Sequence, residues 1–151
     1  MEAEIVKLEL CDFEKCGNIW DLQKHSDLAE QFYREMREGI RSTFFYRIDG
    51  EFIGEISMVT ESDDPDYTVP GKRVYLSRLI VKDIYRRQGI GRKLTDFVIQ
   101  NAAERGYSEM SVGVDLENYP ALKLYYEAGF DTILFVGEDE CGKFVKLLKR
   151  L

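Results

Sequence analysis

Cysteine, histidine and proline are scarce in this chain of 151 residues. It contains three cysteines, three prolines and one histidine, and no two cysteines form a C-x-x-C pair. A structural zinc site usually takes four cysteine or histidine ligands at such short spacings, so the sequence argues against a metal. Few cysteines without a pattern are typical of a protein kept reduced, and we therefore expect a cytoplasmic location.

Long apolar runs and targeting signals are also missing. The first ten residues, MEAEIVKLEL, lack the basic start and the apolar stretch of a secretory signal peptide. No uninterrupted apolar run approaches the ~18 residues that a membrane-spanning helix requires. From the sequence we expect neither secretion nor a membrane as partner.

No linker rich in glycine, serine or proline, no repeat and no low-complexity tract divides the chain. Hydrophobic residues make up 44% and charged residues 32%, a mixture unlike that of disordered, collagen-like or coiled-coil chains. A chain of this length buries roughly 68–70% of its unfolded surface, which is enough for a core without disulfides. We predict one domain, residues 1–151.

Acidic residues outnumber basic ones, 28 against 21, so the formal net charge is −7. Such a balance disfavours nucleic acids and anionic lipids as partners. The charge is unevenly spread, because residues 72–93 carry many bases and a single acid while the rest of the chain is strongly negative. A local reversal of this kind indicates a site for an anion.

Turn signals and hydrophobic periods divide the chain into short strands and helices. Asp49-Gly50 between two β-branched and aromatic runs predicts a tight hairpin. Apolar residues every four positions from Leu28 to Ile40 predict a helix. The predicted strands are 5–10, 43–48, 52–60, 74–81, 107–115, 132–137 and 143–148, and the predicted helices are 12–24, 26–40, 90–105 and 118–128. This order predicts a mixed sheet covered by helices.

The segment Arg86–Arg92, RRQGIGR, lies between a predicted strand and a predicted helix. Free N–H groups and the helix dipole favour phosphate at such a place, and glycine at 89 and 91 lets an anion approach the backbone. A dinucleotide-binding fingerprint would need glycine in place of Leu94, and a P-loop needs four residues between its glycines, so neither motif is present. The alternative is a flexible turn with a solvated basic face.

The pattern R-x-x-G-x-G from Arg86 to Gly91, after the apolar strand 79–81, resembles the GCN5-related N-acetyltransferase (GNAT) superfamily. The resemblance implies an α/β (α+β) fold with a mixed, mostly antiparallel sheet of about seven strands flanked by about four helices. It also implies that the loop binds the pyrophosphate of acetyl-CoA and that the strand pairs with the pantetheine arm. The residues that would bind acetyl-CoA are then Leu79, Ile80, Val81, Arg86, Arg87, Gln88, Gly89, Ile90, Gly91 and Arg92.

A second segment, Asn118–Phe130, is similar to the N-x-x-A-x-x-L-Y-x-x-x-G-F helix of the same family. By that resemblance Asn118 binds the pantetheine and Tyr125 donates a proton to the departing thiolate of coenzyme A. A phenol can serve as that acid, because its ordinary pKa lies only about one to two units above that of a thiol. Tyr125 also shares an apolar helical stripe with Ala121 and Ala128, so a core aromatic is the alternative.

An attacking amine must be neutral, so some group has to accept its proton. Glu55 and Asp115, each on a predicted strand, are the candidate bases, because both could approach the point where the family's sheet opens. The alternative for each is a solvent-facing strand carboxylate. His25 and Cys141 have no sequence neighbour that would make them catalytic.

Three functions from different classes are compatible with these features: an acetyl-CoA-dependent transferase, a non-catalytic acyl-CoA-binding sensor and a basic nucleic-acid-binding module. The net charge disfavours the third, and a phenol at the position of the thiol favours turnover over sensing. We therefore predict direct transfer of acetyl from acetyl-CoA to a primary amine of a small molecule, peptide or protein. A homodimer is compatible with the sequence. A cationic acceptor is favoured by the acidic loop residues Glu61, Asp63, Asp64 and Asp66.

Overall fold

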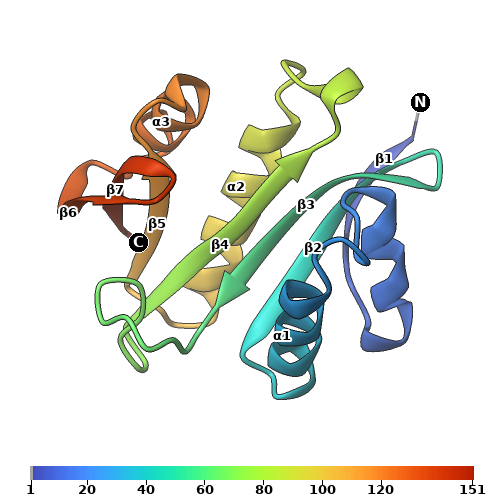
Figure 1. Cartoon of the computed structure of the whole chain (residues 1–151), viewed down its shortest axis with the longest axis horizontal. Helices are drawn as coiled ribbons and strands as arrows, with labels where there is room; N and C mark the ends of the chain where they lie inside the picture. The colour runs from blue at the N-terminus through green and yellow to red at the C-terminus, as the bar shows by residue number, and fades with distance from the viewer. Residues whose placement is uncertain (1) are drawn as a thin grey trace.

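The computed structural model describes residues 2–151, in which one seven-stranded sheet carries helices on both faces (Figure 1). The strands are β1 Ala3–Lys7, β2 Arg41–Ile48, β3 Glu51–Val59, β4 Arg73–Val81, β5 Glu109–Asp115, β6 Thr132–Asp139 and β7 Gly142–Arg150. The helices are α1 Ser26–Arg37, α2 Ile90–Glu104 and α3 Tyr119–Glu127, with two 3-10 helices, η1 Leu10–Asn18 and η2 Asp83–Tyr85. The predicted α/β fold with a mixed sheet is confirmed. No helix of residues 2–151 is long and apolar enough to cross a bilayer.

The strands lie side by side in the order β1-β2-β3-β4-β5-β7-β6. All neighbours are antiparallel except β4 and β5, which are parallel because α2 crosses over between them. The turn at Asp49 and Gly50 joins β2 to β3 as predicted. Both residues have positive φ, 49° and 85°, which suits a two-residue hairpin.

The two faces of the sheet pack against different helices. Ile90, Leu94 and Val98 of α2 are buried in the larger core on one face. On the other face η1 and α1 cover β2 and β3, where Trp20 and Phe32 pack with aromatic residues of those strands (Figure 1). Helices therefore cover both faces of the sheet. A ligand that reaches both faces has to pass between two strands.

The first helix differs from the prediction. Residues 12–24 were expected to be an α-helix, but only Leu10–Asn18 is helical, with 3-10 geometry, and turns follow. Gly17 and Asn18 are weak helix formers, and the carboxylate of Asp21 accepts two backbone N–H groups, which stabilises a turn instead. Strand β1 and helix α1 also end earlier than predicted.

Candidate functional site

The parallel pair β4 and β5 separates halfway along its length. Pairing joins 73–76 to 109–112 and then stops, although β4 continues to Val81 and β5 to Asp115. A bulge lies at the same point, because Ser77 has no register partner on β3. The sheet therefore opens between β4 and β5, and backbone groups along this gap are available to a ligand (Figure 1).

The backbone of β4 beyond the bulge presents alternate residues to the gap. The Lys82 N–H donates to the Ile53 carbonyl on β3 at 2.9 Å, and the Ile80 carbonyl also lies on the β3 side. Because the hydrogen-bonding direction alternates along a strand, Leu79 and Val81 direct their N–H groups toward the gap. Of the three strand residues predicted to pair with pantetheine, two face the gap with their backbone and Ile80 faces β3.

The predicted phosphate loop precedes α2. Gly89 is the N-cap of the helix, with φ 80°, and the space that its side chain would fill is open. Arg87 also has a positive φ, 64°, a strained conformation that is frequent in ligand-binding loops. The Lys93 N–H is the first to bond within the helix, to the Gly89 carbonyl, so the preceding N–H groups are left for a ligand. Such a turn can hold a phosphate group.

The bases of segment 72–93 do not form one positive patch. Arg86 pairs with Asp83 at 2.8 Å and Arg92 pairs with Asp96 at 2.9 Å, both at the loop itself. Earlier in the segment the ion pairs are Arg73 with Glu109, Arg78 with Glu55 and Lys82 with Glu51. Five of the eight bases in this segment are thus paired with acids, four of which lie outside the segment. Affinity for an anion then depends on the N–H groups of α2 as much as on the arginines.

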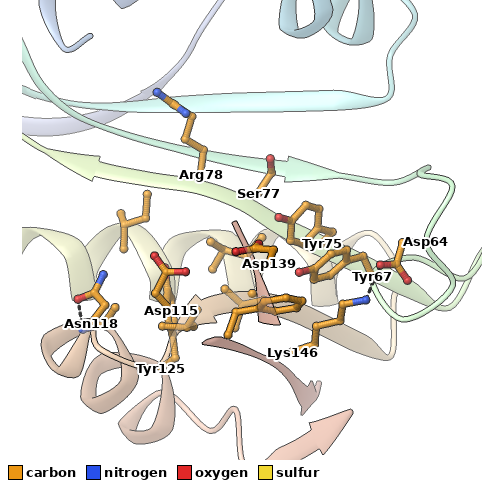
Figure 2. A pocket seen from close by; sticks show the side chains of 17 residues that line it. Asp64, Tyr67, Tyr75, Ser77, Arg78, Asp115, Asn118, Tyr125, Asp139 and Lys146 are labelled. Atoms are coloured by element: carbon orange, nitrogen blue, oxygen red, sulfur yellow. Dashed lines mark hydrogen bonds and ion pairs between the residues drawn. The ribbon is translucent and has the colours of Figure 1, made fainter. Parts of the chain in front are cut away.

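A cleft of about 560 Å³ opens where β4 and β5 separate (Figure 2). One wall is β4, and the opposite wall is formed by β5 and the β6–β7 hairpin, with α3 at one end. Its polar and aromatic lining residues are Asp64, Tyr67, Tyr75, Ser77, Arg78, Asp115, Asn118, Tyr125, Asp139, Phe144 and Lys146. Leu79 lines it as well, so the cleft and the gap in the sheet are continuous.

Tyr125 belongs to both the core and the cleft. It is 6% exposed, and its ring packs edge-on against Phe130 with 5.7 Å between the ring centroids. Within residues 2–151 its hydroxyl has no hydrogen-bond partner and is not fully buried, so it faces the cleft that Tyr125 lines. Burial, and to a lesser degree Tyr75, raises the pKa of Tyr125 above its ordinary value near 10. The pKa of this phenol therefore exceeds that of a thiol by more than the roughly one to two units expected from their ordinary values.

Asn118 and Asp115 lie at the same end of the cleft as Tyr125 (Figure 2). Asn118 is the N-cap of α3, and its Oδ1 accepts the Ala121 N–H at 3.3 Å. This capping bond uses only the oxygen, so the side-chain NH₂ of Asn118 can still donate to a ligand. Asp115 is exposed at the end of β5.

Glu55 is not brought to the lining of the cleft. It is 2% exposed, its Oε1 accepts the Trp20 Nε1–H at 3.2 Å, and its Oε2 lies 3.6 Å from the Arg78 Nε. Burial raises the pKa of Glu55, although the bond from Trp20 and the charge of Arg78 oppose that shift. Of the two predicted bases, only Asp115 lines the cleft.

The remaining candidates lie outside this cleft. His25 directly precedes α1, and Cys141 is exposed in the turn between β6 and β7. All three cysteines are free thiols. Among residues 2–151 no three His, Cys, Asp or Glu side chains are grouped as metal ligands would be.

Several lining residues were missed by the sequence analysis. Lys146 on β7 donates to Asp64 at 2.6 Å and to Asp66 at 3.2 Å, so its single positive charge is shared by two of the four loop acids. This hydrogen bond from Lys146 holds the pKa of Asp64 below its usual value. Tyr67 of the same loop stacks on Tyr75 of β4 with 4.2 Å between the centroids. Local patterns did not indicate that Lys146 meets these acids, because it lies 82 and 80 positions away from them.

The model of the acetyltransferase (GNAT) family matches residues 3–130, which is most of the chain. The chain therefore belongs to the GNAT family, and the resemblance carried by its two motifs is confirmed.

Among curated relatives, the chain is similar to human N-acetyltransferase 8, with 40% identity over 124 residues that cover 81% of this chain and 48% of that protein. It is also similar to mouse N-acetyltransferase 8, with 31% identity over 108 residues that cover 70% of this chain and 45% of that protein. The chain thus spans about half the length of the curated relatives it matches.

The fold is shared with solved acetyltransferase structures. A GNAT family acetyltransferase from Elizabethkingia anophelis with acetyl-CoA bound superposes with a TM-score of 0.73 at 16% identity, covering 99% of this chain and 98% of that chain. The ribosomal-protein-S18-alanine N-acetyltransferase from Escherichia coli superposes with a TM-score of 0.76 at 18% identity, covering 99% and 94%. At such low identity these likenesses establish the fold.

Proposed function

We propose that this protein is an acetyl-CoA-dependent N-acetyltransferase that transfers acetyl directly to a primary amine. The observation that carries the proposal is the gap between β4 and β5, because it leads into the cleft that Tyr125 lines. A thioester bound along the gap would place its phosphates at the N-terminal turn of α2 and its acetyl group in the cleft. Membership of the GNAT family supports this arrangement.

The donor would be held mainly by backbone groups. In this proposal the Val81 N–H pairs with an amide of the pantetheine arm and the Leu79 N–H faces the thioester. The Asn118 side-chain NH₂ donates to the pantetheine arm as well. The phosphates take the N–H groups at the start of α2, where the open space beside Gly89 leaves room for them. The loop residues Arg86, Arg87, Gln88, Ile90, Gly91 and Arg92 complete this site.

The transfer needs one proton removed and one supplied. The neutral amine attacks the thioester carbon, an N–C bond forms, and the C–S bond breaks as its electron pair moves to sulfur. Asp115, directly or through a water molecule, accepts the proton of the amine, and Tyr125 donates its proton to the sulfur. The Leu79 N–H would stabilise the negative charge on the carbonyl oxygen. Both side chains recover their protonation states from solvent.

A non-catalytic acyl-CoA sensor is the alternative, since it would use the same loop and gap. A sensor needs no second opening beside the acyl group, whereas this cleft has polar walls on both sides of the gap. We therefore favour turnover.

The protonated acceptor would be attracted by Asp115 and Asp139, while the loop contributes less charge than its four acids suggest because Lys146 pairs with two of them. The homodimer and the cytoplasmic location stay predictions.

The test is to incubate the protein with acetyl-CoA and a panel of amines and peptide N-termini. Free thiol reports release of coenzyme A, and mass spectrometry identifies the acetylated product. We expect release of thiol to match formation of an amide. Tight binding of acetyl-CoA, measured by calorimetry, without product for any acceptor would instead support the sensor.

A further inference from the structure

Building on the proposed N-acetyl transfer, we propose that the acceptor is a small primary amine that also carries a carboxylate, and that Ser77 and Arg78 bind this carboxylate. The two walls of the cleft differ in chemistry. The β4 wall presents hydrogen-bond donors, whereas the facing wall presents the carboxylates of Asp115 and Asp139, and Lys146 on that wall is already paired with Asp64 and Asp66 (Figure 2). A molecule with an ammonium and a carboxylate complements both walls.

Ser77 is oriented as a donor by a buried arginine. Arg41 is 5% exposed, and its Nη2 donates to the Ser77 Oγ at 2.9 Å. The guanidinium is fixed by Glu35, which its Nε reaches at 3.0 Å, and by the ring of Phe32 at 3.7 Å from the centroid. Because Arg41 occupies a lone pair of the serine oxygen, the hydroxyl hydrogen of Ser77 is left for an acceptor in the cleft.

Arg78 keeps donors that the protein does not use. Its guanidinium lies 4.5 Å from the centroid of the Trp20 ring, and its Nε stands 3.6 Å from Glu55, too far for a hydrogen bond. Among residues 2–151 this buried Nε has no hydrogen-bond partner, while the side chain as a whole is 21% exposed and lines the cleft. Trp20 and Glu55 hold the planar group in place, and a carboxylate can bind its remaining N–H groups in the bidentate manner that arginine favours.

The bulge in β4 places the two donors together. Consecutive side chains of a regular strand point to opposite faces, but Ser77 and Arg78 lie on the same face because Ser77 is the extra residue. Figure 2 shows both rising from β4 on one side. Leu79, whose backbone faces the gap, is the next residue, roughly 3.3 Å further along the strand. An amino acid can therefore place its carboxylate at Ser77 and Arg78 while its amine attacks a thioester at Leu79.

The first test compares matched acceptors with the unaltered protein. Alanine, methionine and phenylalanine are each assayed as the free amino acid, as the amide and as the decarboxylated amine, with kcat/KM expressed per neutral amine. We expect each acid to exceed its amide and its amine by roughly 10–100-fold, the range for a charge-assisted hydrogen-bonded pair. Equal values within each set, or acetylation of other amines and peptides alone, would overturn the inference and leave the proposed function standing. If no amine is acetylated, both the inference and the proposed function are wrong.

Variants then locate the carboxylate. Arg78→Gln and Ser77→Ala should raise KM for the amino acids and leave KM for the decarboxylated amines unchanged, whereas a purely structural role would change both. Arg78→Lys should retain part of the preference for acids, because lysine keeps the positive charge but cannot bind a carboxylate in the bidentate manner of a guanidinium. Arg47→Gln is the matched control, since Arg47 forms an ion pair with Glu4 outside the cleft. If the preference for acids survives in both Ser77→Ala and Arg78→Gln, the carboxylate does not bind at this wall.

Discussion

Replacing Tyr125 with phenylalanine removes one oxygen atom from the cleft and keeps the ring. The ring packs against Phe130, and the hydroxyl has no hydrogen-bond partner within residues 2–151. The free energy of unfolding should therefore change by less than about 1 kcal/mol, because no internal hydrogen bond is lost. Affinity for coenzyme A should be unchanged as well, since Tyr125 would meet the donor only at its sulfur.

The chemical step should slow markedly. A positioned proton donor typically contributes 10²–10⁴-fold. Burial raises the pKa of Tyr125, and a weaker acid gives less help to the departing thiolate, so we expect the lower end of that range. A loss of about 10²-fold corresponds to about 2.7 kcal/mol in activation free energy.

The same pKa shift determines how the rate varies with pH. A phenol whose pKa lies above 10 keeps its proton from pH 6 to 9, so a rate that rises over this range reports deprotonation of the amine. Tyr125→Phe should lower the profile without changing its shape. The measurement is single-turnover transfer, followed by quenching and thiol detection. A variant as fast as the parent across this range would refute the donor role and make Tyr125 a packing residue.

Three further predictions concern other parts of the site. Gly89→Asp should weaken coenzyme A binding at least ~10-fold in calorimetry, and Gly39→Asp, which also replaces a glycine at positive φ in open space, is the control that should bind normally. Gly113→Ala should slow transfer but spare coenzyme A binding, because the new Cβ would collide with the Tyr67 hydroxyl over β5; weakened binding would show that this contact supports the donor instead. Phe135 is 46% exposed on the edge strand β6, and Phe135→Asp should turn the expected homodimer into a monomer in sedimentation, whereas an unchanged dimer would exclude this edge.

Local patterns were sufficient where structure depends on neighbours in the chain. The hairpin at Asp49 and Gly50 needs only two residues that tolerate positive φ between two strand-forming runs. The passage from β4 through Gly89 into α2 likewise follows from an apolar run, a glycine turn and a helical period. These features were predicted because each combines residues within a few positions of one another.

The cleft could not be predicted in this way, because its walls join distant segments. Lys146 and Asp64 are 82 positions apart, and no periodicity indicates that they pair. Whether Glu55 would face the cleft depended on which strand face η1 and Trp20 cover. Local patterns also do not predict where β4 and β5 stop pairing. Leu76 and Val112 form the last pair, and no residue type in either strand indicates that pairing ends there.

The opening of the sheet has a cost, and Arg41 helps to offset it. If β4 and β5 stayed paired to their ends, the N–H groups of Leu79 and Val81 would bond to β5, and each lost bond forgoes about 1 kcal/mol. The bulge at Ser77 falls where pairing with β5 stops, and Arg41 donates to Ser77 at that point, so the buried guanidinium stabilises the bulge. The contact that orients the Ser77 hydroxyl thus also supports the gap through which a donor on one face of the sheet and an acceptor on the other could react.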